Sequence, residues 1–130
     1  MNDLPSTIPL ASENRYRLDH FTDRRAQLET NRGMSAEEID RTIRNFDDGS
    51  PLGAALAGHH AALFGLYRGS LAWYELALNR GAPKAEMALN RGLMMQRLHD
   101  VVGARKALDT AVAGMPGDRD VWHFRQVLGP

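Results

Sequence analysis

Residues 88–116 read ALNRGLMMQRLHDVVGARKALDTAVAGMP, and the spacing of small and bulky residues in this stretch is the strongest indication of the fold. Its two apolar runs have the period of amphipathic helices. Asp100 stands between them as an N-cap, and Gly114 and Pro116 end the second run. The stretch therefore predicts a helical hairpin, which favours a binding scaffold over an enzyme.

Capping residues and apolar periods predict further helices on either side of this hairpin. Ser35 and Glu38 form a capping-box pattern, and Ser50 followed by Pro51 starts another helix. The triplet 68–70, Arg-Gly-Ser, is interpreted as the end of that helix and the cap of the next. No run alternates β-branched and polar residues as a strand would. We expect an all-α fold of about six to seven helices, over residues 18–30, 35–46, 51–67, 71–80, 83–98, 101–113 and 121–128.

Size and composition indicate one folded domain behind a short arm. The chain has 130 residues, of which 43% are hydrophobic and 25% charged, and this suits a single globular core. Residues 1–17 mix prolines and polar residues without a helical or strand period. We therefore expect a flexible N-terminal arm over residues 1–17 and one α-helical domain over residues 18–130.

Charge and cysteine content argue against several classes of protein. Sixteen Lys and Arg balance sixteen Asp and Glu, so nucleic acid is not the expected partner. The absence of cysteine removes disulfides, thiolate metal sites and a cysteine nucleophile, and it fits a reducing cytoplasm. The N-terminus lacks the apolar region of a secretory signal, and no run is long enough to insert in a membrane. We expect a cytoplasmic protein.

The chain is self-similar at a period of 34 residues, which separates a stacked repeat from a simple bundle. Sliding the sequence by this amount aligns small residues with small ones and bulky residues with bulky ones, except at Trp122. The aligned positions are Ala54 with Ala88 and Trp122, Gly58 with Gly92, Tyr74 with Leu108, and Ala77 with Ala111.

Residues 85–118 resemble one repeat of the tetratricopeptide family, in which two antiparallel helices form each 34-residue unit. The matching positions are Ala88, Arg91-Gly92, Met95, Ala104, Leu108, Ala111 and Pro116. Three of them depart from the family pattern, with Ala88 in place of Trp, Arg91 in place of Leu and Met95 in place of an aromatic residue. Residues 51–84 resemble a degenerate repeat, residues 119–128 the first helix of a truncated one, and residues 18–46 are expected to cap the array.

The resemblance implies that the first helix of each pair lines a concave groove for a protein or peptide segment. The residues that it assigns to partner binding are Leu52, Ala55, His59, Leu63, Glu86, Leu89, Asn90, Leu93, Gln96 and Arg97. Because half of these are leucine or alanine, the expected ligand is an amphipathic helix or an extended apolar segment. If His59 faces the groove, affinity is expected to vary with pH near its ordinary pKa of about 6.5.

Other interpretations of the same residues remain open. The apolar positions in 51–67 and 83–98 are equally compatible with an ordinary core covered by residues 18–46. A self-associating structural subunit is the second functional hypothesis. Apolar-grooved members of the tetratricopeptide family include bacterial type III secretion chaperones, and this analogy extends the first hypothesis, a non-enzymatic adaptor or chaperone.

The sequence predicts no catalytic residue, no metal site and no cofactor. His59 and His60 are adjacent, so on a helix they point in directions about 100° apart and do not easily share one ion. The chain contains none of the H-E-x-x-H, G-x-S-x-G or phosphate-cradling glycine motifs. A small helical enzyme or metal protein is therefore the least favoured of the three functional classes.

Overall fold

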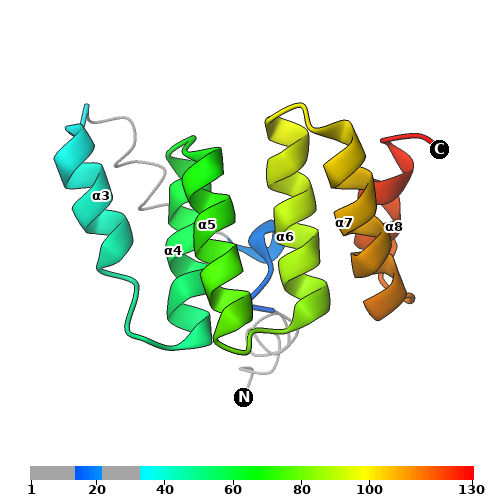
Figure 1. The fold of residues 1–130 in the computed structure, drawn as a ribbon, viewed down its shortest axis with the longest axis horizontal. Coiled ribbons are helices and arrows are strands. Elements are labelled where there is room, and N and C mark those ends of the chain that lie inside the picture. The colour runs from blue at the N-terminus through cyan, green and yellow to red at the C-terminus, as the bar shows by residue number, and fades with distance from the viewer. Residues whose placement is uncertain (1–13, 22–32) are drawn as a thin grey trace, which may run out of the picture.

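The computed structural model of the protein describes residues 14–21 and 33–130, and in these ranges it is all-α. Six α-helices pack as adjacent antiparallel pairs, as the sequence predicts. Figure 1 shows the helices in a row along the long axis, from α3 at one end to α8 at the other. The elements are the 3-10 turn η1 (Leu18–His20), α3 (Ala36–Arg44), α4 (Pro51–Leu63), α5 (Tyr67–Asn79), α6 (Lys84–Arg97), α7 (Val101–Gly114) and α8 (Arg119–Gln126).

The helix starts are confirmed at the predicted caps. At α3, Ser35 accepts a hydrogen bond from the backbone N–H of Glu38, and the Glu38 side chain accepts one in return. Ser50 caps α4, whose first residue is Pro51. Asp100 caps α7 in the same way. These short-range bonds satisfy backbone donors that have no partner within the helix, so the starts can be predicted from local sequence.

The predicted boundary at residues 68–70 is wrong. Helix α4 ends at Leu63 rather than at residue 67, and Gly65 makes the break with a φ of +78°. A residue with a side chain rarely adopts this conformation, whereas glycine does so readily. Helix α5 begins at Tyr67, so the Arg-Gly-Ser triplet lies inside it. Ser70 is buried there and donates a hydrogen bond to the carbonyl of Gly58 (2.8 Å), which joins α5 to α4.

The N-terminal predictions also need correction where the structure describes them. The expected helix over 18–30 begins instead as the 3-10 turn Leu18–His20, and Phe21 is extended. Residues 22–30 and 1–13 lie outside the described residues. Residues 14–17 are not a free arm, because they pack on the helical body, where Arg17 is only 3% exposed.

The two central hairpins repeat the same close contact 34 residues apart. A Cβ added at Gly58 would lie 2.6 Å from the Tyr74 ring, and one added at Gly92 would lie 2.8 Å from the Leu108 side chain. Glycine on the first helix of each hairpin therefore makes room for a bulky residue on the second. Both bulky residues are fully buried. The 34-residue period found in the sequence therefore corresponds to a repeated contact between the two helices of each hairpin.

This close contact predicts that Gly92→Val destabilises the protein by about 2 kcal/mol, because the added carbons have to displace Leu108. Gly69→Val is the matched control. Gly69 is also helical, but its Cβ would make only an ordinary 3.8 Å contact with Leu66. Urea unfolding measures both changes. Equal midpoints for the two variants would show that the Gly92 contact does not matter.

None of the helices in residues 14–21 and 33–130 is long and apolar enough to cross a membrane.

Candidate functional site

One short stretch of chain, residues 14–21, lies across three of the helices, and we call it the docked segment. Its contacts reach His59 on α4, Glu86 and Asn90 on α6, and Asp118 at the start of α8. The segment appears in blue near the middle of the row in Figure 1. We call the side of α4, α6 and α8 that it covers the inner face. This is the side that the repeat register assigns to a groove.

Asn90 holds the backbone of the docked segment at two points. Its amide nitrogen donates to the carbonyl of Tyr16 (2.7 Å), and its amide oxygen accepts from the backbone N–H of Leu18 (2.8 Å). Asn90 is fully buried. An amide carries both a donor and an acceptor, so one side chain can pair with the two backbone groups on either side of Arg17, whose own backbone is extended (φ −93°, ψ 129°). The contact is independent of the side chains that the segment carries.

His59 makes a third backbone contact and is held in one tautomer. Its Nε2 lies 3.0 Å from the carbonyl oxygen of Arg15, and its Nδ1 lies 2.7 Å from the Tyr74 hydroxyl. A carbonyl only accepts, so Nε2 carries the proton and Nδ1 accepts from Tyr74. Burial lowers the pKa of His59 to about 4. His59 is therefore a neutral donor at pH 7, and its ordinary pKa of about 6.5 no longer gives a reason to expect a change in affinity near that pH.

Arg17 anchors the docked segment by charge. Its guanidinium makes two hydrogen bonds to Asp19, at 3.0 and 2.7 Å, and also binds the carboxylate of Asp118. Burial alone would lower the pKa of Arg17, but the bonds to Asp19 and Asp118 outweigh it and raise the pKa. The same bond from Arg17 holds the pKa of Asp118 below its ordinary value. Both groups are therefore charged throughout the neutral range.

The predicted partner-binding residues divide into three groups in the structure. Fully buried are Ala55, His59, Leu89 and Asn90. Half-buried are Leu52, Leu63, Glu86 and Leu93, while Gln96 and Arg97 are exposed. Of the ten, His59, Glu86 and Asn90 bind the docked segment, whereas Ala55 and Leu89 belong to the apolar core. Leu52 and Leu63 lie near the two ends of α4.

The remaining three predicted residues, Leu93, Gln96 and Arg97, line an open groove of about 780 Å³ beside the docked segment. The docked segment contributes Leu18 and Asp19 to the lining of this groove, and α8 contributes His123 and Phe124. The apolar lining residues are Leu18, Tyr67, Leu93, Met94, Phe124 and Val127, and the polar ones are Asp19, Gln96, Arg97, His99 and His123. The inner face therefore has an occupied part and an open part.

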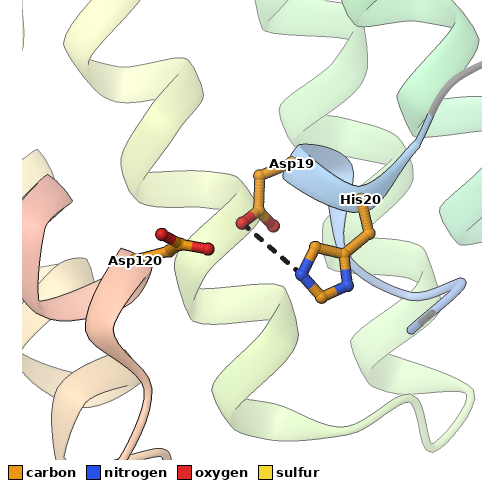
Figure 2. A group of neighbouring side chains, drawn as sticks. All are labelled: Asp19, His20 and Asp120. Atoms are coloured by element: carbon orange, nitrogen blue, oxygen red, sulfur yellow. Dashed lines mark ion pairs between the residues drawn. The ribbon is translucent and has the colours of Figure 1, made fainter. Parts of the chain in front are cut away.

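Among the described residues, one group has the composition of a metal site. Figure 2 shows Asp19 and His20 from η1 beside Asp120 from α8, with their ligand atoms within 4.8 Å of one another. The Asp19 carboxylate is already bound by Arg17, and His20 Nδ1 accepts a hydrogen bond from the backbone of Asn14 (3.2 Å). The buried guanidinium of Arg17, which lies 2.7 Å from the Asp19 carboxylate, would also repel a metal cation bound there. The group is therefore explained as part of the docking contacts.

Sequence reasoning missed the ion pair between Arg17 and Asp118. The two residues are 101 positions apart, and neither belongs to a periodic pattern that relates them. Asp118 has a visible local role, because its side chain caps α8 by accepting from the backbone N–H of Val121 (3.1 Å). Nothing in the single sequence distinguishes this cap from one that also holds an arginine.

No family model, curated protein or solved structure matches the chain. The resemblance to the tetratricopeptide family therefore rests on the 34-residue register alone.

Proposed function

We propose that the protein is a non-enzymatic adaptor or chaperone of the cytoplasm that holds an apolar or amphipathic segment of a partner protein on the inner face. The observation that supports this function is the docked segment itself. Three of its backbone groups are bound by Asn90 and His59, which are both fully buried and fixed by their surroundings. The inner face is thus a preformed site for a short polypeptide segment, which in the docked segment is a turn over residues 14–17 followed by η1.

Backbone recognition suits an adaptor or chaperone. Main-chain hydrogen bonds supply affinity without demanding one sequence, and neighbouring pockets then select side chains. The donor on His59 and both groups of Asn90 are already in place, so binding costs little reorganisation. The open groove with Leu93 and Phe124 offers an apolar surface on which a longer segment can continue. A tetratricopeptide-like array, including the type III secretion chaperones, would use its inner side in this way.

A reversible cross-link that holds the docked segment in place, which we call the lock, tests this function. Asn14 and Glu86 are hydrogen-bonded through their side chains (3.0 Å), and the chain has no cysteine, so Asn14→Cys with Glu86→Cys introduces the only two thiols. Closing this pair with a disulfide or a short bismaleimide keeps the docked segment in place. Capture of cellular partners is followed by cross-linking and mass spectrometry, with the open and closed forms compared.

We expect the open form to capture a partner that cross-links to α4, α6 or α8, and the closed form to lose it. Reduction of the disulfide should restore capture in the same sample. Equal capture by both forms, or cross-links confined to α5 and α7, would contradict binding on the inner face. The Asn14→Cys variant alone is the control for the effect of the substitution.

A second candidate function is self-association, and the exposure of Trp122 favours it. Trp122 is 48% exposed beside a hollow of about 550 Å³, whereas Ala54 and Ala88, in the same register, are buried. Helices α5 and α7 pack on α4 and α6, whereas the main described contact of α8 is with the preceding helix α7. Light scattering over a range of concentrations tests whether a second copy covers this end. A constant monomer mass would exclude this candidate.

A further inference from the structure

We infer that the partner segment carries an arginine followed by an apolar residue, and that Asp118 selects this arginine by taking it in the place of Arg17. The inference rests on the proposed function, because it assumes that a partner lies on the inner face. It adds the chemistry of that partner. It also means that the docked segment and the partner segment compete for one position.

The site that binds the Arg17 side chain has the chemistry that a guanidinium requires. The side chain is 3% exposed although it is charged, and it donates hydrogen bonds to the carboxylates of Asp19 and Asp118. Asp19 belongs to the docked segment and leaves with it, but Asp118 is fixed at the N-cap of α8. The planar fork of arginine bridges Asp118 while it keeps a second pair of donors, which the single ammonium of lysine cannot do.

Displacement of the docked segment leaves an acidic surface that needs a cation. Asp118 is only about one quarter exposed, so without Arg17 its carboxylate is partly desolvated and unpaired. Glu86 loses the hydrogen bond from Asn14 at the same time. Asp120 lies close by on α8 (Figure 2). A segment without a basic residue would leave these carboxylates unpaired.

The position of the apolar residue follows from the backbone contacts. Asn90 binds the carbonyl of Tyr16 and the N–H of Leu18, so the residue between them is the one whose side chain reaches Asp118. Leu18 comes next and packs on the core cluster that contains Met87 and Met94, at the edge of the open groove. The register of the backbone bonds therefore fixes an Arg-apolar pair on any segment that binds in this way.

A peptide of this chain serves as the probe. Labelled peptide NRYRLDHF, residues 14–21, is titrated into the full chain carrying Arg17→Ala, which weakens the chain's own docked segment. The same titration uses a peptide with alanine and one with lysine in place of Arg17. Because the same chain is used each time, competition from its own segment is constant across the three peptides.

We expect the arginine peptide to bind at least about 10-fold more tightly than the alanine and lysine peptides. Adding Asp118→Asn to the chain should remove most of this preference. Asparagine is also a good N-cap, so this substitution removes the charge while α8 keeps its cap. Asp120→Asn makes the same change of charge on α8 at a residue that does not bind Arg17, and it should leave the preference intact.

A second measurement covers the case in which Arg17→Ala disturbs folding. The backbone N–H of Leu18 donates a hydrogen bond to Asn90, and its hydrogen exchange is followed in the full chain without added peptide. We expect exchange at least about 10-fold faster in Asp118→Asn than in Asp120→Asn. Equal affinity of the three peptides, no binding of any peptide, or equal exchange in the two variants would overturn the arginine assignment. The lock experiment on cellular partners would still decide the proposed function separately.

Discussion

Replacing Leu89 with glutamate is expected to unfold the protein. Leu89 is fully buried on α6 and packs with Leu108, Ala111 and Val121 from the two following helices. Loss of a buried leucine costs about 2–5 kcal/mol, and an unpaired carboxylate in the same place adds a further penalty. Domains of this size have a free energy of unfolding of about 5–15 kcal/mol, so most of the stability is lost. Circular dichroism and thermal melting measure the effect.

Leu93→Glu, one turn later on the same helix, is the matched control. Leu93 is half-buried at the open groove and stands four residues before Arg97, which favours a helical ion pair with a glutamate at position 93. We expect a cost of about 1 kcal/mol and near-normal helical content. The pair thus separates a core residue from a groove residue, although the sequence assigned both to the groove. Similar melting temperatures for the two variants would show that Leu89 is not part of the core.

Acidification from pH 6.5 to pH 4 is expected to lower the free energy of unfolding by about 3 kcal/mol through His59. The unfolded pKa is 6.5, and burial lowers the folded pKa to about 4. The folded state therefore binds the proton less well than the unfolded state, so stability is present above pH 6.5 and is lost as the pH falls through about 4. Urea unfolding at a series of pH values measures how the free energy of unfolding changes with pH.

His59→Gln is the control for the assignment, because glutamine does not titrate and can still donate to the carbonyl of Arg15. This variant should show a nearly flat stability between pH 6.5 and 4. The carboxylates of Asp47 and Asp118, whose pKa values are lowered by Arg80 and Arg17, lose their contribution at lower pH, below their ordinary value of 3.8. A flat profile in the unmodified protein would contradict the buried, neutral state of His59.

Much of the fold could be predicted because its determinants are local. The starts of α3, α4 and α7 depend on one cap residue and the backbone three positions later. The boundary after α4 was missed because Gly65 and the Arg-Gly-Ser triplet are both good stop patterns. Burial of Ser70 against α4 decided between them.

The candidate site was predicted less well than the fold. His59, Glu86 and Asn90 were placed on the inner face from the repeat register, and all three bind the docked segment. Leu89 was assigned to the same face because register gives only the direction of a side chain. Whether a side chain meets solvent or another helix depends on α8, which packs over this position.

The all-α class, the caps and the glycine contacts of the two hairpins follow from the amino-acid sequence, since these depend on near neighbours and on a repeated spacing. The position of residues 14–21 on the inner face and the pairing of Arg17 with Asp118 emerge from the packing of the helices. That ion pair and the bonds of Asn90 join residues 72 to 101 positions apart. Bonds of this kind leave no period in the sequence, because they depend on where the packed helices place each end of the chain.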